Sequence, residues 1–306
     1  MLRAVETLGY RPNRAARELS TGRGGVLGML VPDVANPFFA ELIRSAQTAA
    51  RAREKLLLIA DTAQSEAQER ELLESLAGQI DGVIVCSSRL GPAHLADGVP
   101  RLPMVFVNRR EDDVPAVVID QGAIVGVSVR HLRALGHRQL AFLSGPAHLW
   151  SSQRRIEAVR AWQSSDELAL DLVGPFDPTF EGGAKAAEPL LATGATGVIA
   201  FNDVMALGLM NRLSALGVSV PGDVSVVGSD DVPLARMWTP ALTTVAAPTH
   251  GAGISAVELL CGLTLEGGLT ARAGRGADEA PDPLRYVELE GHLIVRGSTA
   301  EKRGRR

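Results

Sequence analysis

The chain has 306 residues, of which 46% are hydrophobic, and this supplies enough apolar material for about two globular domains. Its formal net charge of −4 excludes a protein that coats nucleic acid over its whole surface, so any contact with DNA must be local. The sequence shows neither an apolar run as long as a membrane span nor an N-terminal signal-peptide core. We therefore expect a cytoplasmic protein without a membrane partner.

The N-terminal segment is basic and predicts a short helix ahead of the first buried strand. Pro12 ends a preceding helical pattern, and Asn13 can cap a new helix on which Ala16 and Leu19 share one face. The apolar run at 26–31 follows directly and has the length of a buried strand. A helix this short is marginal in isolation, so we expect it to be ordered only against a partner or a ligand. A solvated linker helix is the alternative interpretation.

From residue 26 onwards, short apolar runs alternate with helical patterns, which is typical of βαβ units and parallel sheets. The predicted strands are 26–31, 55–60, 82–85, 104–107, 116–119, 139–143, 169–173, 197–200, 224–227, 241–245, 284–289 and 292–295. The predicted helices are 39–53, 66–78, 92–96, 123–135, 153–162, 182–192, 203–215 and 251–263. This order predicts an α/β fold with two similar, doubly wound lobes. Residues 266–283 are expected to form a mobile surface loop, and the basic end at 301–306 is expected to be disordered.

Several short segments resemble, in the same order, those of the lactose-repressor/galactose-repressor (LacI/GalR) family of bacterial transcription regulators. They are LGYRPN at 8–13, NPFF at 36–39, FND at 201–203, GSDD at 228–231 in place of GYDD or GFDD, PALTT at 240–244 and IVRGST at 294–299. Each segment is a weak signal alone, but together they are specific. The resemblance extends over almost the whole chain, from residue 2 to residue 299.

The resemblance implies a core of the type I periplasmic-binding-protein-like fold, with two parallel-sheet lobes and three crossovers. It places the crossovers near Ile119, Ala247 and Pro283. The core would then span residues 26–306, and residues 1–25 would be the remnant of a helical DNA-binding headpiece and its hinge helix. The implied division gives lobe 1 about 26–118 and 248–282, and lobe 2 about 119–247 and 283–299.

The resemblance also implies where the protein binds its partners. The implied ligand contacts are Phe38, Phe39, Asn108, Arg155, Phe176, Asn202 and Asp230, and the implied DNA contacts in the hinge are Asn13, Ala16, Arg17 and Leu19. Leu19 would act as the apolar wedge in the DNA minor groove. Three positions depart from the common pattern and leave the identity of the ligand open; they are Ala158, Ser229 and Ala247.

The residues themselves support these assignments unequally. Two adjacent carboxylates, Asp230 and Asp231, follow a predicted buried strand and are poorly explained by packing. Asp203 is more simply a helix cap. Of Arg154 and Arg155, one should be a solvated surface charge. Phe38 and Phe39 can also be lid or core residues.

We therefore expect a ligand-responsive, DNA-binding repressor that acts as a homodimer and binds a small sugar or similar metabolite between its lobes. Family members have two helices before residues 1–8, which complete a helix-turn-helix. Because this sequence starts after them, we expect either an upstream start with operator binding or a binding-protein-like receptor without operator recognition. A periplasmic-type transport receptor is the rival class, and the missing signal segment and the Asn13–Leu19 helix count against it.

An enzyme is a further rival, but the sequence shows no catalytic constellation. It has no G-x-S-x-G elbow after a strand, and its glycine-rich segment at 22–25 precedes a strand instead of following one. Its histidines lack metal-ligand spacing, and Cys86 and Cys261 are expected to be buried, reduced thiols. We expect no metal and no cofactor.

Overall fold

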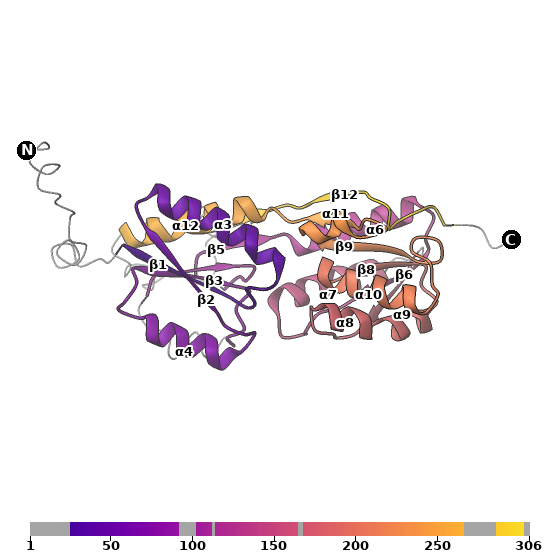
Figure 1. Cartoon of the computed structure of the whole chain (residues 1–306), viewed down its shortest axis with the longest axis horizontal. Helices are drawn as coiled ribbons and strands as arrows, with labels where there is room; N and C mark the ends of the chain where they lie inside the picture. Colours follow the sequence, from indigo (N-terminus) through magenta and orange to yellow (C-terminus); the bar gives the residue numbers. More distant parts are fainter. Residues whose placement is uncertain (1–24, 92–101, 112–113, 165–167, 266–285, 303–306) are drawn as a thin grey trace, which may run out of the picture.

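The chain folds into two lobes that lie end to end along its longest axis (Figure 1). The structure is a computed structural model, and it describes residues 25–91, 102–111, 114–164, 168–265 and 286–302. In these ranges each lobe contains one six-stranded sheet, with the strand orders β11-β5-β4-β3-β1-β2 and β12-β10-β9-β8-β6-β7. Neighbouring strands are parallel except for β10 and β12, which are antiparallel. This confirms the predicted fold of two doubly wound lobes.

The first lobe has helices on both faces of its sheet (Figure 1). Its strands are β1 (Val26–Val31), β2 (Leu56–Asp61), β3 (Gly82–Cys86), β4 (Met104–Val107), β5 (Ala116–Ile119) and β11 (Tyr286–Leu289). One face carries α3 (Pro37–Ala52) and α12 (Thr249–Leu265), and the other carries α4 (Glu66–Leu76). Because both faces are covered, β3, β4 and β5 are buried at every position, which explains why they are continuous apolar runs in the sequence.

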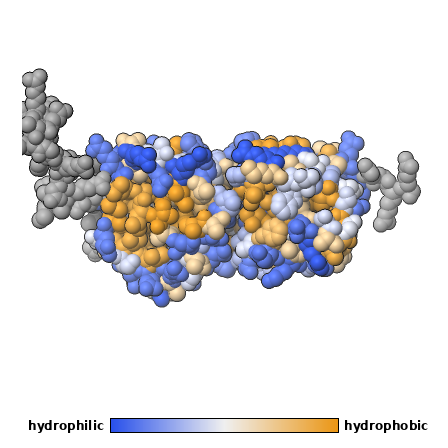
Figure 2. Space-filling view, viewed as in Figure 1, coloured by the Kyte–Doolittle hydropathy of each residue, from blue (hydrophilic) through white to orange (hydrophobic). Residues whose placement is uncertain are grey.

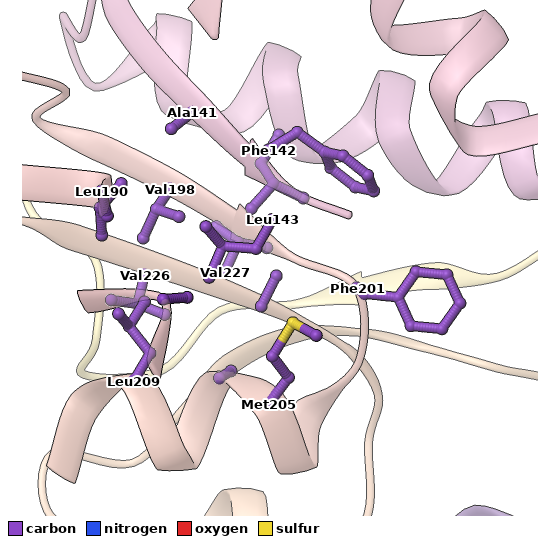
Figure 3. Close-up of a cluster of buried hydrophobic side chains, with 14 of the residues drawn as sticks. Ala141, Phe142, Leu143, Leu190, Val198, Phe201, Met205, Leu209, Val226 and Val227 are labelled. Carbon is purple, nitrogen blue, oxygen red and sulfur yellow. The ribbon is translucent and has the colours of Figure 1, made fainter. Parts of the chain in front are cut away.

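The second lobe repeats this plan. Its strands are β6 (Gln139–Leu143), β7 (Ala169–Val173), β8 (Gly197–Ala200), β9 (Ser225–Asp230), β10 (Thr243–Ala246) and β12 (His292–Ile294). Its helices are α6 (Gln121–Ala134), α7 (Trp150–Gln163), α8 (Phe180–Lys185), α9 (Ala187–Thr193), α10 (Asp203–Ala215) and α11 (Pro233–Met237). Figure 3 shows the core of this lobe, where Met205 and Leu209 of α10 point towards the sheet and the Phe142 ring lies on the side of the sheet away from α10.

The predicted third crossover near Pro283 is wrong. The strand β11 pairs with β5 in the first sheet, so residues 286–289 belong to the first lobe and the chain crosses after Leu289. Only two residues separate β11 from β12, so the chain changes lobes within this short connection. Gly291 permits the crossing, because a Cβ atom there would lie 2.8 Å from the carbonyl oxygen of Ala246.

Two smaller predictions also differ from the structure. The helix predicted at 182–192 is divided into α8 and α9, since Pro189 has no N–H to continue the helical hydrogen bonds. The short helix α11 was not predicted. The hinge residues Asn13, Ala16, Arg17 and Leu19, the predicted helix at 92–96 and the predicted loop at 266–283 lie outside the described residues. None of the helices within the described ranges combines the length and apolarity needed to cross a membrane.

Candidate ligand-binding cleft

A cavity of about 80 Å³ lies between the two lobes, where loops that follow the strands of both sheets meet. Six of the seven predicted ligand contacts line it, and they are Phe38, Phe39, Asn108, Arg155, Asn202 and Asp230. The seventh, Phe176, is not part of the lining. Its ring packs against the core of the second lobe, and its backbone N–H donates to the Ser144 carbonyl at 3.0 Å. The structure therefore brings together side chains that are more than 100 positions apart in the sequence.

Two phenylalanines at the start of α3 supply the aromatic wall of the cavity. The side chain of Asn36 caps this helix by accepting a hydrogen bond from the Phe38 N–H at 3.1 Å, and Pro37 occupies the first turn. The rings of Phe38 and Phe39 are edge-to-face, with centroids 5.0 Å apart. Both residues also belong to the core of the first lobe, so the core role and the lining role apply together.

Arg155 is the central cation of the cavity and projects from α7. Its Nε donates to Gln121 Oε1 at 2.6 Å, its Nη2 donates to Ser229 Oγ at 3.2 Å, and its Nη1 donates to the Phe201 carbonyl. The Phe201 ring centroid lies 4.7 Å from the guanidinium carbon. Burial lowers the pKa of Arg155 to about 10, although the carboxylates of Asp230 and Asp203 oppose this shift, so it stays protonated at neutral pH.

The neighbouring arginine has a different role. Arg154 is exposed and pairs with Glu157 across one helical turn, with an N···O distance of 2.8 Å. The expectation that one of the two arginines is a surface charge is thus confirmed, and the surface residue is Arg154.

Asp230 is the carboxylate that the second lobe contributes to the cavity lining, and it ends β9. Its φ of 124° is a strained conformation for a residue with a side chain, which is typical of positions retained for function. Burial raises the pKa of Asp230 well above its ordinary value, the Asp203 carboxylate adds to this, and Arg155 opposes it. The adjacent Asp231 is already paired with Arg296 at 2.5 Å.

The cap of α10 is Asn202 and not Asp203, and Asn202 also lines the cavity, whereas Asp203 is held inside the second lobe. Asn202 is the N-cap of α10, and its Oδ1 accepts from the Met205 N–H at 2.8 Å while its Nδ2 donates to the Pro178 carbonyl at 3.1 Å. The carboxylate of Asp203 accepts from Thr244 Oγ1 at 2.5 Å and from the Val232 N–H at 2.9 Å. Burial raises the pKa of Asp203 to about 6.

The structure adds lining residues that sequence reasoning missed, and Gln121 and Arg89 are the most informative of them. Gln121 comes directly after β5 and holds Arg155, and Arg89 lies in the loop that follows β3. Both lie just beyond the carboxyl end of a parallel strand, and this position in an open α/β sheet is the sequence signal for them. The cleft thus offers aromatic rings, a guanidinium and hydrogen-bonding side chains. Within the described part of the chain, no group of three histidine, cysteine or carboxylate side chains could hold a metal ion.

Two α/β lobes with a polar cleft between them define a ligand-binding domain of the periplasmic-binding-protein type. A family model described as a periplasmic binding protein-like domain matches residues 129–299. The ribose operon repressor of Halalkalibacterium halodurans is 31% identical over 98% of this chain and 87% of its own length. The repressor CytR of Escherichia coli is 31% identical over 97% of this chain and 86% of its own length.

Solved structures agree with these relatives. A LacI family regulator from Enterococcus faecium with bound ribose has a TM-score of 0.76 and 25% identity, and the match covers 91% of this chain and 100% of that one. The regulator CelR in complex with cellobiose has a TM-score of 0.76 and 28% identity, with 97% and 88% of the two chains covered. The chain belongs to the LacI family of transcriptional regulators, which confirms the predicted family.

Proposed function

We propose that this protein is a transcriptional repressor that responds to a small carbohydrate bound between its lobes. The observation that carries the proposal is that the buried Arg155 and the half-buried Asp230 line one inter-lobe cavity together with the rings of Phe38 and Phe39. Carboxylate and guanidinium groups bind the hydroxyls of a sugar, and the phenylalanine rings can contact its apolar face. Relatives and structural neighbours named as a ribose operon repressor, a ribose complex and a cellobiose complex support this ligand class.

The ligand would act by holding the lobes together. A ligand that contacts Phe38 in the first lobe and Asp230 in the second binds better to a closed arrangement than to an open one, so it shifts the population towards closure. In a homodimer, closure changes the distance between the two hinge segments that precede Gly25. We assign DNA contact to Asn13, Ala16, Arg17 and Leu19 in these segments, with operator DNA as the partner and the cytoplasm as the location.

Calorimetry against a panel of neutral pentoses, hexoses, disaccharides and nucleosides tests this proposal. We expect at least one compound to bind, and we expect Asp230→Asn and Arg155→Lys each to weaken its binding by about tenfold or more, because each removes a charge-assisted hydrogen bond. Arg154→Gln is the matched control, since it removes the neighbouring exposed arginine and should leave binding unchanged. Full affinity in a folded Arg155→Ala and Asp230→Ala double variant would show that the ligand binds elsewhere.

A further inference from the structure

Arg89 is the one arginine of the cleft lining, within the described residues, whose donors are left without acceptors. Its Nη2 donates to Gln64 Oε1 at 3.1 Å, but Nε and Nη1 are buried and have no hydrogen-bond partner. Buried guanidinium donors without acceptors are costly, and native proteins retain them where something else supplies the acceptor. Arg89 also lines the cleft, so a rotation of its side chain towards the cavity would bring these donors to acceptors on a bound molecule.

Two arginines that are buried in the described part of the chain have acceptors for their guanidinium groups and can be compared with Arg89. Arg155 donates to three oxygen acceptors. Arg109 pairs with Glu111, with Nε 2.9 Å from its Oε1, and also donates to the carbonyl of Leu90. Each guanidinium nitrogen of these two arginines has an acceptor in the protein, whereas two of the nitrogens of Arg89 have none among the described residues.

The carboxylates near Arg89 do not replace a ligand. Glu69 is buried, but its two oxygens accept from the Ser88 hydroxyl and from the backbone N–H of Arg89 at 2.9 Å. These bonds fix the loop and leave the guanidinium unpaired. Burial lowers the pKa of Arg89, and the charges of Glu69 and of Asp177 from the second lobe oppose this, so the side chain carries a positive charge into the cleft.

We propose that Arg89 binds an oxyanion, either a carboxylate or a phosphate, on a carbohydrate whose hydroxyls are held by Arg155 and Asp230. The inference rests on the proposed function and makes it more specific. Asp230 supplies a hydrogen-bond acceptor for neutral hydroxyls, and Arg89 supplies a second, cationic contact from the opposite lobe. The ligand is therefore a sugar acid or a sugar phosphate. A guanidinium suits both groups, because its planar array of donors matches their oxygens.

Calorimetry with matched ligands tests this assignment. The probes are ribose with ribonate and ribose 5-phosphate, and glucose with glucuronate and glucose 6-phosphate, so that each neutral sugar is compared with its carboxylate and its phosphate. We expect one anionic member to bind about 10- to 100-fold more tightly than its neutral parent. We expect Arg89→Gln to abolish this preference while the affinity for the neutral parent stays within about twofold, and Arg89→Lys to retain part of it.

A control variant and two alternative outcomes decide whether Arg89 binds the anionic group. Arg212→Gln removes an exposed arginine paired with Glu188 at 3.0 Å, so it controls for net charge and should keep the preference. Binding of neutral sugars that depends on Asp230, with no gain for any anionic member, would overturn the role of Arg89 and leave the proposed function standing. Equal weakening of neutral and anionic ligands by Arg89→Gln and by Asp177→Asn would show instead that Arg89 pairs with the second lobe, and this would also overturn the assignment.

Discussion

At the scale of single residues, the cleft depends on a buried charge arrangement that neighbouring side chains hold in place. Gln121 and Ser229 accept hydrogen bonds from Arg155, which fixes the direction of its guanidinium. Thr244 and the Val232 N–H anchor Asp203, whose negative charge raises the pKa of Asp230. Burial, with this charge added to it, therefore keeps the carboxyl of Asp230 protonated to a higher pH than that of an ordinary aspartate.

This arrangement predicts a pH dependence of sugar binding. The ionised carboxylate of Asp230 is the form that accepts hydrogen bonds from the sugar hydroxyls. Where Asp230 is protonated in the free protein, sugar binding must release that proton, so the affinity for sugar should rise with pH until the pH exceeds the pKa of Asp230. We expect the affinity to fall as the pH is lowered from 8 to 5, by up to about tenfold per unit below that pKa. Calorimetry across this range measures it. Asp230→Asn should flatten the Asp230 part of the profile, and an equally steep profile in that variant would contradict the assignment.

Most of these residues could be predicted from the sequence, because strand ends place them and the family pattern names them. Sequence reasoning could not show that the Asn202 side chain is used as a helix cap, because a cap and a ligand contact require the same polar residue at a strand end. Nor could it show that the Phe176 ring turns towards the lobe core, since this depends on packing against distant side chains. The unsatisfied donors of Arg89 are visible only once every nearby acceptor has been located.

At the scale of elements, the interior strands are buried, whereas the edge strand β2 and the surface helix α11 expose apolar side chains. Strands β1, β4, β5, β6 and β8 were predicted with their observed bounds, because largely buried parallel strands are distinct apolar runs, and the bounds of the edge strand β7 were also correct. The assignment of β11 to the second lobe was wrong, because the pairing of β11 with β5 depends on contacts in the folded sheet that the sequence does not show.

The edge strand β2 exposes Leu56 and Leu58, and α11 in the other lobe exposes Leu234 and Met237. Figure 2 shows hydrophobic residues gathered on both lobes of the viewed face.

Exposed leucines on an edge strand favour association with another chain, so we propose that β2 and α11 contribute to a homodimer. Sedimentation velocity at micromolar concentration should give twice the mass of the 32.3 kDa chain. Leu58→Lys combined with Met237→Lys should weaken the dimer by about tenfold or more, because two charges would be buried in the contact. Leu191, which is exposed on α9 and not on an edge strand, gives the control Leu191→Lys. A monomeric wild-type protein would exclude this role for β2 and α11.

At the scale of the whole molecule, two rigid sheets are joined by three short crossings that lie beside the cleft. The backbone N–H of Asp120 donates to the Leu289 carbonyl at 2.9 Å, which ties the first crossing to the third. Trp150 of the second lobe packs against apolar side chains of the first lobe, so the lobes are in contact in this structure. Small rotations at the crossings can therefore open or close the cavity without disturbing either core.

The most direct test is hydrogen–deuterium exchange of the full chain, with and without the tightest-binding sugar of the panel. At a ligand concentration of 100 times Kd, we predict that exchange slows by more than about tenfold in the segment after β1, at 32–36, and in the segment after β9, at 230–232. These segments lie on opposite lobes, so their joint protection shows that one ligand bridges the cleft. Protection confined to one lobe, or absent from both segments, would contradict the account.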